Sequence, residues 1–405
     1  MNSTVVGLDI GTTKVTAVVG EMIDEHHTRV IGVGITPSQG MEKGLVVNVE
    51  QTTRCIQQAI DEAQRMADLA IGYVYIGIAG GHIQSSNQIA RIDLKGATCI
   101  TRNDVERLIE EAKGFYLPGD KEIIHAIPRE FSLDSEPEIR DPIGMVGSTL
   151  EGSIHVVTGA VSAIRNMVQC AHNVNLDVAD VILQPLASAE AVLTDDERKM
   201  GVILVDIGGG TTDLAIFQKG KLTHSAVIPV GGGHFTNDLA HYLKCPYSEA
   251  EKLKIRYGSV LEDLVDSELK IEVDTLGGEG RRTVPLGTIV EVLNYRGDEL
   301  VELCLAEVRQ HVPNLNSFAA GIVVTGGGAQ IRGIDGIFQA HSNLGVRLGK
   351  IRNVTGLVEK VSSPIFATAV GLIFYGYKNH ELVLQEYHEE GVMERLVAVV
   401  KSWFL

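Results

Sequence analysis

The stretch VVGLDIGTTKVTAVVG at residues 5–20 has a counterpart, GVILVDIGGGTTDLAIFQKG, at residues 201–220. In both, an apolar run reaches an Asp, breaks into Gly and Thr, and becomes apolar again. A Gly-rich turn between two strands presents successive backbone N–H groups, and glycine lets the backbone approach a phosphate closely. Each segment alone also fits an ordinary β-hairpin. Because the pattern opens each half of the chain, we predict two jaws of one phosphate clamp, one per lobe.

The two turns supply candidate phosphate and metal ligands. Lys14 would offer a positive charge to the phosphates, and Asp9 and Asp206 would lie near a hydrated Mg²⁺ ion. The first turn ends in Lys14 and the second in Asp213, which we expect to add negative charge near the metal. The candidate residues of the two turns are Asp9, Gly11, Thr12, Thr13, Lys14, Asp206, Gly208, Gly209, Gly210, Thr211, Thr212 and Asp213.

Three further segments fit a nucleotide site. PVGGGHFTNDL precedes a helix whose N-terminus would favour anions, and TGGGAQIRG follows an apolar strand and would let a flat base lie against bare backbone. In SEAEKLKIRYG, Glu251 and Lys254 share one helix face, where they would hold a ribose or adenine or else form a solvated ion pair. The candidate glycines of these segments are Gly231, Gly232, Gly233, Gly326, Gly327 and Gly328.

Length and composition bound the class of protein. The 405 residues are enough for two domains or one bilobed body, and the net charge of −17 argues against a duplex nucleic-acid partner. The N-terminus has no signal-peptide pattern, and no run of about eighteen apolar residues occurs, so we expect neither export nor a membrane span. Five scattered cysteines predict a reduced, cytosolic protein with buried thiols: Cys55, Cys99, Cys170, Cys245 and Cys304.

Strands and helices alternate along the chain, which predicts an α/β architecture. In the first half we expect strands at 4–10, 14–22, 28–37 and 73–81 and helices at 52–69, 103–114 and 161–176. Residues 178–193 read as a strand running into a helix, and residues 195–199 read as a charged loop. Beyond these, residues 272–293 look rich in strands and residues 298–311 helical.

The segment GVMERLVAVVKSWFL at 391–405 has helical amphipathicity. A helix of this length spans about 22 Å, which is too short to cross a bilayer, but its aromatic residues suit a membrane interface. A helix docked on the protein's own core is the alternative. The residues that we expect on the membrane-facing side are Met393, Leu396, Val397, Val400, Trp403 and Phe404. The polar residues 379–390 would act as a short linker, which limits the distance between body and membrane.

LDIGTTK, VDIGGGTTD, VGGGHFTNDL and TGGGAQIRG together resemble the nucleotide signature of the actin, seventy-kilodalton heat-shock chaperone and sugar kinase superfamily. That resemblance implies ATP and Mg²⁺ as cofactors, with two phosphate loops and TGGG as the adenosine loop. VILQPLASAEAVL resembles the interlobe connection, and Gln184 falls where actin carries its water-positioning glutamine. Gln184 and Asp206 are therefore the candidate catalytic residues for ATPase activity that is slow at most.

Within the superfamily, KVTAVVGE, EGSIHVVTGA, VDIGGGTTDLAIF and AEKLKIRYG make the chain most similar to the FtsA family of bacterial cell-division proteins. The resemblance implies a bilobed actin-like α/β fold with an inserted subdomain in each lobe and a C-terminal amphipathic helix. The expected parts are a first lobe (1–84), its inserted subdomain (85–158), a return to the first lobe with the interlobe connection (159–197), the second lobe (198–230), its inserted subdomain (231–300), the return to the second lobe (301–378), the linker (379–390) and the membrane helix (391–405).

The family resemblance also implies a function and partners. Such a protein polymerises on the cytoplasmic side of the inner membrane at the division septum, and it anchors the FtsZ ring there. Residues 231–300 would bind the C-terminal peptide of FtsZ, and residues 85–158 would serve polymer contacts and later division proteins. The alternatives are an actin-like scaffold of type IV pilus assembly, which needs no membrane helix, and a small-molecule kinase, which needs a further carboxylate for its second substrate.

Overall fold

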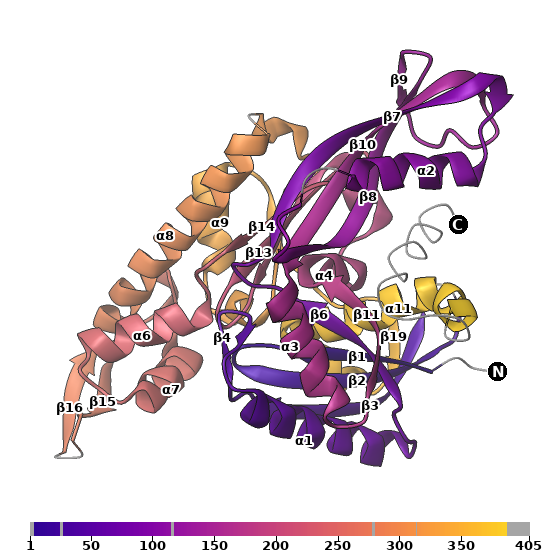
Figure 1. The fold of residues 1–405 in the computed structure, drawn as a ribbon. Helices are drawn as coiled ribbons and strands as arrows, with labels where there is room; N and C mark the ends of the chain where they lie inside the picture. The colour runs from indigo at the N-terminus through magenta and orange to yellow at the C-terminus, as the bar shows by residue number, and fades with distance from the viewer. Residues whose placement is uncertain (1–3, 25–26, 115–116, 278–279, 313, 387–405) are drawn as a thin grey trace.

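Two mixed sheets, one in each lobe, form the body of the computed structural model (Figure 1). The structure describes residues 4–24, 27–114, 117–277, 280–312 and 314–386. The first sheet has the order β11 (Asp177–Leu183), β6 (Tyr73–Ile78), β1 (Thr4–Ile10), β2 (Lys14–Met22), β3 (Thr28–Pro37) and β19 (Val354–Gly356). The second has the order β14 (Lys221–Ile228), β13 (Thr212–Gln218), β12 (Val202–Ile207), β17 (Ile322–Thr325) and β18 (Val346–Leu348).

The two sheets share one topology. β1 pairs antiparallel with β2 and parallel with β6, and β12 pairs antiparallel with β13 and parallel with β17. In both lobes the first strand of the hairpin carries its Asp near its C-terminal end, at Asp9 and Asp206. The repeated pattern in the sequence is thus a repeated sheet topology, and the prediction of a bilobed α/β fold is confirmed.

Helices α1 (Val49–Ala67) and α11 (Ala367–Glu386) cover opposite faces of the first sheet. A Cβ on Gly20 would lie 2.6 Å from Ile373 of α11, whereas a Cβ on Gly32 would lie 2.6 Å from the Ala63 carbonyl oxygen of α1. Gly32 pairs with Val19 and therefore faces the same side of the sheet as Val19. Gly20 follows Val19 on the same strand and so faces the other side, because consecutive residues of a strand face opposite sides. The close approach of each helix therefore depends on a glycine beneath it.

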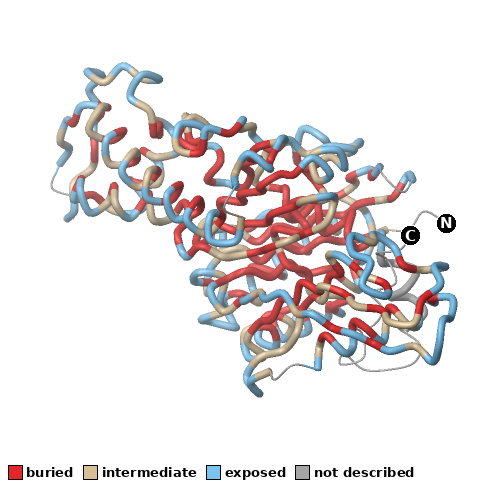
Figure 2. Tube along the Cα trace, turned by 90° about the horizontal axis from the view of Figure 1, so that it is seen from above, coloured by how far each residue is buried: buried red, intermediate tan, exposed pale blue. Residues whose placement is uncertain are grey.

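The second sheet lies between two hydrophobic cores. Val202 and Leu204 of β12 pack into the core of the first lobe, while Ile203 and Val205 pack into the core of the second. Helix α4 (Gln184–Val192) contacts β12, β13 and α11, so it connects the lobes and lies between them. Figure 2 shows the buried residues running through the middle of the molecule, with exposed residues at its rim.

A small sheet with one helix is inserted into the first lobe (Figure 1). Its order is β7 (Gln84–Cys99), β10 (Val146–Ala160), β8 (Lys121–Leu133) and β9 (Glu136–Ile139), and α2 (Arg102–Lys113) packs on β7 and β10. Strands β7, β8 and β10 contact β14, and Ser85 Oγ donates a hydrogen bond to the Ser225 carbonyl oxygen at 2.6 Å. The inserted sheet therefore adjoins the edge of the second-lobe sheet.

The remaining elements complete both lobes. In the second lobe, α6 (Gly232–Tyr242), α7 (Tyr247–Tyr257) and a hairpin of β15 (Lys270–Asp274) and β16 (Arg281–Pro285) form the arm at the lower left of Figure 1, and α8 (Leu286–His311) runs from this arm toward the top of the view. The other elements are β4 (Met41–Glu42), β5 (Leu45–Val46), α3 (Val161–His172), α5 (Asp195–Met200), η1 (Glu262–Leu264), η2 (Leu315–Ser317), η3 (Gly327–Gln330), α9 (Ile334–Ser342), α10 (Val358–Val361) and η4 (Pro364–Phe366). Within the described residues, no helix combines the length and apolar character needed to cross a membrane.

Two local predictions were wrong. The expected charged loop at 195–199 is helix α5, because Thr194 and Glu197 form a capping box in which each side chain accepts the other residue's backbone N–H. The second error is at residues 286–293, whose β-branched residues suggested a strand. They are the first turns of α8, which begins directly after Pro285 and buries Ile289 and Val290.

Several expected boundaries fall inside continuous elements. The boundary between residues 84 and 85 lies within β7, and that between 158 and 159 lies within β10. The boundary between 197 and 198 lies within α5, and that between 300 and 301 lies within α8. Helix α11 continues to Glu386, so residues 379–386 of the expected linker are helical. All five cysteines are free; four are buried as expected, whereas Cys99 at the end of β7 is exposed.

Candidate functional site

The two Gly-rich turns have matching backbone geometry. Gly11 N–H donates to the Lys14 carbonyl oxygen at 3.0 Å, and Gly208 N–H donates to the Thr211 carbonyl oxygen at 2.9 Å. The strand registers pair Asp9 with Thr16 and Asp206 with Asp213. Lys14 is therefore equivalent to Thr211, and Asp213 is equivalent to Thr16. Lys14 and Asp213 therefore occupy different positions, because Asp213 lies two residues further along its strand than Thr211.

The turns of the two lobes touch each other. A Cβ on Gly209 would lie 2.3 Å from Thr13 Cγ2, and a Cβ on Gly210 would lie 2.7 Å from Thr12 Oγ1. Only glycine allows this approach, since a side chain at either position would push the turns apart. Gly44 N–H also donates to Thr12 Oγ1 at 3.3 Å. The contact between turns from separate lobes confirms that they face each other, as the sequence predicted.

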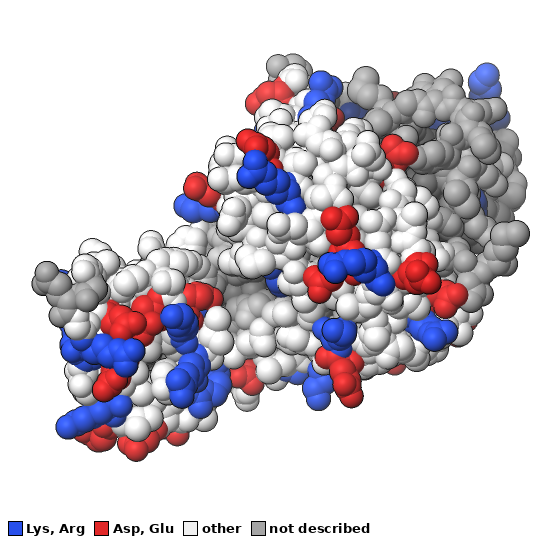
Figure 3. Space-filling model, turned by 90° about the horizontal axis from the view of Figure 1, so that it is seen from below, with Lys and Arg blue, Asp and Glu red and all other residues white. Residues whose placement is uncertain are grey.

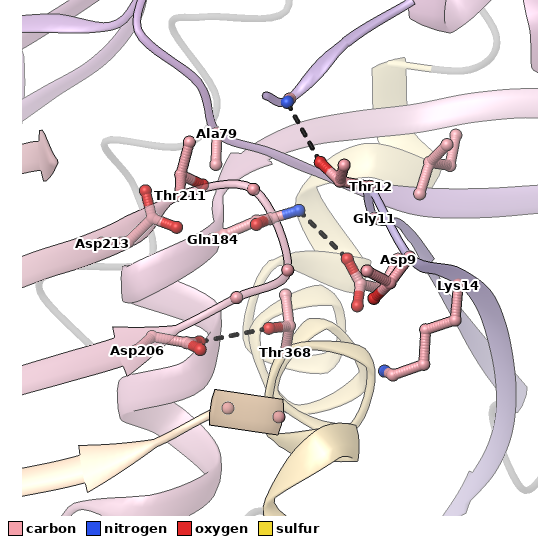
Figure 4. A pocket seen from close by; sticks show the side chains of 18 of the residues that line it. Asp9, Gly11, Thr12, Lys14, Ala79, Gln184, Asp206, Thr211, Asp213 and Thr368 are labelled. Carbon is pink, nitrogen blue, oxygen red and sulfur yellow. Dashed lines mark hydrogen bonds between the residues drawn. The ribbon is translucent and has the colours of Figure 1, made fainter. Parts of the chain in front are cut away.

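Three buried carboxyl groups and one amide point toward the space beside these turns (Figure 4). Gln184 Nε2 donates to Asp9 Oδ1 at 3.0 Å. Asp206 Oδ2 accepts hydrogen bonds from Ser188 Oγ at 2.5 Å and from Thr368 Oγ1 at 3.4 Å. Asp213 Oδ1 is buried and has no hydrogen-bond partner in the described part of the chain. One acid of the site is thus left incompletely satisfied.

Burial shifts the charges of this site. It raises the pKa of Asp9, and it raises that of Asp206 to about 6 with help from the charge of Asp9. Burial also raises the pKa of Asp213 well above its usual range, with help from the charges of Asp206 and Asp9. Burial also lowers the pKa of Lys14, against the attraction of Asp9 and Asp206. Carboxyl groups that are costly to ionise on their own favour the arrival of a cation.

Lys14 is held at the wall of the pocket. Its Nζ donates to the Ile365 carbonyl oxygen in η4 and to Thr16 Oγ1 at 3.4 Å, and it lies 5.6 Å from the centre of the Phe366 ring. Figure 4 shows the side chain pointing away from the tip of its own turn. The ammonium group is therefore positioned by backbone from the far end of the chain.

The TGGG segment packs on the end of β12, directly before the second turn. Gly326 has φ +84°, and a Cβ there would lie 2.3 Å from Asp206 Oδ1. A Cβ on Gly327 would make only an ordinary contact, with Ile365 Cγ2 at 3.7 Å, whereas a Cβ on Gly328 would lie 2.2 Å from Ile207 Cγ2. Gly326 and Gly327 line the pocket and Gly328 does not.

The glycines at the start of α6, Gly231 at its N-cap and Gly232 and Gly233 in its first turn, are not free to bind an anion in the way we expected. Gly232 N–H and Gly233 N–H donate to the carbonyl oxygens of Gly208 and Gly209 at 2.8 and 2.7 Å. Gly231 N–H donates to His234 Nδ1 at 3.1 Å. This helix N-terminus therefore braces the second turn, because its N–H groups already have partners.

Glu251 and Lys254 share a helix face as predicted, but they contact protein groups. Lys254 Nζ bonds Glu251 Oε2 at 2.8 Å, Thr236 Oγ1 at 2.8 Å and the Gly232 carbonyl oxygen at 2.9 Å. Thr236 Oγ1 also donates to Glu251 Oε2. The pair fixes the start of α6, which in turn supports the second turn.

Most sequence-predicted residues gather around one pocket, and seven nucleotide-site candidates lie outside its lining. The described lining includes Asp9, Gly11, Thr12, Thr13, Lys14, Gln184, Asp206, Gly208, Gly209, Gly210, Thr211, Asp213, Gly326 and Gly327. Among the candidates beyond the lining, Thr212 is buried and donates to the Val230 carbonyl oxygen at 2.8 Å. The others are Gly231, Gly232, Gly233, Glu251, Lys254 and Gly328. The six membrane-helix candidates between Met393 and Phe404 lie outside the described residues.

Sequence reasoning missed the residues that hold the acids. Ser188 could have been found, because it lies one helical turn after Gln184 and so shares its face of α4. Through this face, one helix bonds Asp9 of the first lobe and Asp206 of the second. Thr368 and Ile365 gave no sequence signal, since they reach the pocket only through the return of the chain at η4 and α11.

Two lobes with one repeated sheet topology, and a Gly-rich turn from each in mutual contact, define an actin-like protein. Solved structures support this class: a PilM–PilN type IV pilus biogenesis complex superimposes with a TM-score of 0.67 at 16% identity, covering 93% of this chain and 99% of that one. The ADP-bound MreB5 of Spiroplasma citri superimposes with a TM-score of 0.56 at 18% identity, covering 96% and 99%. At these identities the similarity concerns the fold alone.

Sequence comparison identifies the family. Residues 203–371 match the family model "Cell division protein FtsA", and residues 80–158 match "SHS2 domain inserted in FTSA". The cell division protein FtsA of Pseudomonas aeruginosa is 42% identical over 92% of this chain and 89% of its own length. Those of Escherichia coli K12 and Neisseria meningitidis are 38% and 37% identical over 98% of this chain, and over 95% and 96% of their own. The chain belongs to the FtsA family of cell division proteins.

Proposed function

We propose that this chain binds ATP between its lobes, polymerises on the cytoplasmic side of the inner membrane and anchors the FtsZ ring there. The contact of Thr13 with Gly209 and of Thr12 with Gly210 carries the nucleotide part of the proposal. A chain of phosphates held by both turns would favour the closed arrangement of the lobes, because it would bind that arrangement more tightly. The ADP-bound relative of the same fold supports this assignment by analogy.

The donor groups of the pocket fit Mg²⁺. This ion prefers oxygen ligands and usually keeps several water molecules, with one or two carboxylates and substrate phosphates completing its shell. Lys14 is the one Lys or Arg in the described pocket lining, against three buried acids, and Asp213 Oδ1 has no partner. We propose that Asp9 and Asp206 hold the ion through water and that Asp213 adds charge beside it. When bound, the ion would neutralise phosphate charge.

The supporting residues behind the second turn have a proposed role in nucleotide affinity. Gly232 and Gly233 bond the carbonyl groups of the turn, and Gly231 packs against it, since a Cβ there would lie 2.7 Å from the Gly208 carbonyl oxygen. Lys254 with Glu251 holds the start of α6. Their effect on phosphate binding would be indirect, through the position of the turn. The bare backbone of Gly326 and Gly327 would face the adenosine.

Slow ATP hydrolysis is proposed, with the nucleotide acting as a switch for conformation or polymerisation. Gln184 would position the attacking water, since its amide is oriented by Asp9 at the pocket wall. A small-molecule kinase would need a further carboxylate for its second substrate. The carboxylates in the described lining are Asp9, Asp206 and Asp213, which the metal role already uses.

The second inserted subdomain offers a groove for the C-terminal peptide of FtsZ. The groove lies between α6 and α8, and exposed aromatic rings of Tyr242 and Tyr295 border it. Arg296, which bonds Asp238 at 2.5 and 2.9 Å, sits in the same groove. Aromatic side chains with a central Arg are typical of peptide-binding hot spots.

The first inserted subdomain is proposed for self-contacts and for later division proteins. Its sheet ends in strand β7, whose Ile89 is 82% exposed, and Val146 of the neighbouring β10 is 66% exposed. An edge strand with exposed apolar residues is suited to pairing with another chain. We propose no nucleic-acid partner, because Lys and Arg are interspersed with Asp and Glu on the face shown in Figure 3 and the net charge is −17.

Vesicle co-sedimentation tests the anchoring proposal. The full chain with Mg-ATP should pellet with inner-membrane lipid vesicles and carry purified FtsZ with it, whereas a chain ending at Glu390 should bind FtsZ but stay in solution. Trp403→Asp should abolish pelleting, while the matched control Ser402→Asp, on the expected polar face, should retain it. Equal pelleting of the full and shortened chains would overturn the membrane part of the proposal.

Two further variants test FtsZ binding in the same experiment. Tyr295→Ala should reduce FtsZ recovery at least tenfold without changing the pelleting of the chain itself. Ile255→Ala is the control, since Ile255 is 75% exposed on α7 and does not line the groove. Undiminished FtsZ recovery with Tyr295→Ala would exclude the groove as the binding site.

A further inference from the structure

A second group of polar side chains lies outside the lining of the pocket, where the end of α8 meets strand β14. His224 comes from β14, and Glu307 and His311 lie one turn apart on α8. One ligand atom of each of these side chains lies within 4.8 Å of those of the other two. His224 Nε2 and Glu307 Oε1 are 2.9 Å apart, and His311 Nδ1 and Glu307 Oε1 are 3.5 Å apart. The three side chains therefore converge on one point.

The three residues are of the kind that binds transition metals. Imidazole nitrogen and carboxylate oxygen suit zinc, copper, nickel and iron, and two His with one Glu is a known three-ligand set for zinc. His311 is the last residue of α8, where the unpaired carbonyl groups of the helix end favour a positive charge. The side chains of His224, Glu307 and His311 are 8%, 25% and 34% exposed. An ion could thus enter from one side and keep a water ligand.

We propose that His224, Glu307 and His311 form a binding site for a divalent transition metal ion of the zinc class. The ion would bind three protein ligands and a water molecule in a tetrahedral shell. It would connect the edge strand of the second-lobe sheet to the C-terminal end of α8. This site is separate from the nucleotide pocket and does not depend on the function proposed for that pocket.

Binding requires one local rearrangement. The rings of His224 and His311 are stacked, with centroids 3.5 Å apart and an interplanar angle of 17°, so the lone pairs of their nitrogens lie in two separate, nearly parallel planes. The rings would have to turn apart for both nitrogens to point at one ion. Coordination would replace the hydrogen bond between His224 and Glu307 and the contact of His311 Nδ1 with the Glu307 carbonyl oxygen at 3.1 Å, because a metal-bound nitrogen has no hydrogen to donate.

A third histidine next to the site, His155, is not one of its ligands. His155 lies close, with its ring centroid 6.3 Å from that of His224, but its two nitrogens already contact Asn87 Oδ1 at 2.8 Å and Ser225 Oγ at 3.0 Å. His155 is therefore a buried neighbour from β10 and not a ligand. Through it, the ion would lie next to the junction between the inserted sheet and the second lobe, and would stiffen that junction.

Zinc binding to the metal-free full chain tests the proposal. Titration with Zn²⁺ by calorimetry, with excess Mg-ATP present to occupy the nucleotide pocket, should give one equivalent with a micromolar or tighter dissociation constant. Glu307→Gln keeps the shape of the side chain but removes its charge, and His311→Gln removes one ligand. Each should weaken zinc binding at least about tenfold. His341→Gln is the matched control, because His341 pairs with Asp298 at 3.2 Å elsewhere on the surface.

Two further readouts separate this site from others and from misfolding. The absorption of bound Co²⁺ should lack the intense near-ultraviolet band of thiolate ligands, since no cysteine belongs to the site. The metal-free variants should keep the circular dichroism spectrum and FtsZ recovery of the wild-type chain. Unchanged zinc affinity in both variants, a thiolate band, or binding no tighter than millimolar in the wild-type chain would each overturn the proposal.

Discussion

Asp206 and Asp213 lie directly opposite each other on β12 and β13, and both carboxyl groups are buried. Like charges in this cross-strand arrangement destabilise a sheet. The first lobe avoids the conflict, because Thr16 occupies the position equivalent to Asp213. The second lobe therefore carries an acid that costs stability in the absence of a cation, as expected for a site selected for binding.

Asp213→Asn should stabilise the metal-free chain. The substitution keeps the shape of the side chain and removes the need to bury a third carboxyl group beside Asp9 and Asp206. We expect the melting temperature in EDTA at pH 7.5 to rise by a few degrees, on the order of 1–2 kcal/mol, and Mg-ATP affinity to fall. Asp263→Asn, at an exposed residue in η1, should leave both unchanged. A lower melting temperature for Asp213→Asn would contradict the account.

The stability of the metal-free chain should contain a pH-dependent contribution from Asp206. Its pKa is raised from 3.8 to about 6, so between these values the folded chain holds the proton more tightly than the unfolded chain. This contribution is fully present below about pH 4 and is lost as the pH rises through about 6. It amounts to on the order of 3 kcal/mol. Denaturant titrations of the wild type and Asp206→Asn measure it as a difference.

The comparison with Asp206→Asn is needed because buried histidines change the stability with pH in the opposite direction. Burial lowers the pKa of His125 to about 4 and that of His155 to about 3, so their contribution to stability grows as the pH rises toward 6.5. These groups are present in both proteins and cancel. Parallel stability curves for wild type and Asp206→Asn between pH 4 and 7 would rule out the raised pKa of Asp206.

Two substitutions of Gln184 should have different effects. Gln184→Ala removes the amide that contacts Asp9 and should slow ATP hydrolysis at least tenfold, with little change in nucleotide affinity. Gln184→Glu places another acid 3 Å from Asp9 and should lower the melting temperature of the metal-free chain relative to Gln184→Ala. The two melting curves and single-turnover hydrolysis check this pair. Equal hydrolysis by wild type and Gln184→Ala would remove Gln184 from the chemistry.

Gly326→Ala should be far more harmful than Gly327→Ala. The first places a Cβ 2.3 Å from Asp206 Oδ1 in a backbone with φ +84°, whereas the nearest atom to a Cβ on Gly327 is 3.7 Å away. We expect Gly326→Ala to lose roughly 2–4 kcal/mol of unfolding free energy and Gly327→Ala less than about 1 kcal/mol. Urea denaturation of both compares them directly. Equal stability of the two variants would show that Asp206 can move aside.

The repeated sheet could be predicted from the sequence because its apolar strands and Gly-rich turns are local signals. The bounds of β1, β2 and β3 agree with the predicted ranges 4–10, 14–22 and 28–37. Helix α5 could also have been predicted, since Thr194 and Glu197 form a recognisable capping box. The start of α8 could not be predicted, because its β-branched residues favour a strand locally and only the burial of one face makes them helical.

The contacts that hold the site could not be predicted, because they join distant parts of the chain. Lys14 depends on the Ile365 carbonyl oxygen, and Asp206 depends on Thr368. The histidine cluster combines an i,i+4 pair on α8, visible in the sequence, with His224 on a strand that only folding brings near. The glycines before α6 carried an anion-binding pattern, but their N–H groups are taken by the neighbouring turn.

Binding of Mg-ATP tests the central claim most directly, since that claim is a phosphate clamp formed by one turn from each lobe. Equilibrium titration of the full chain should show one ATP bound, at least about tenfold more weakly in EDTA than with Mg²⁺. Lys14→Ala and Asp206→Ala, one in each lobe, should each weaken binding at least about tenfold. Wild-type affinity in both variants, or affinity independent of Mg²⁺, would contradict the clamp.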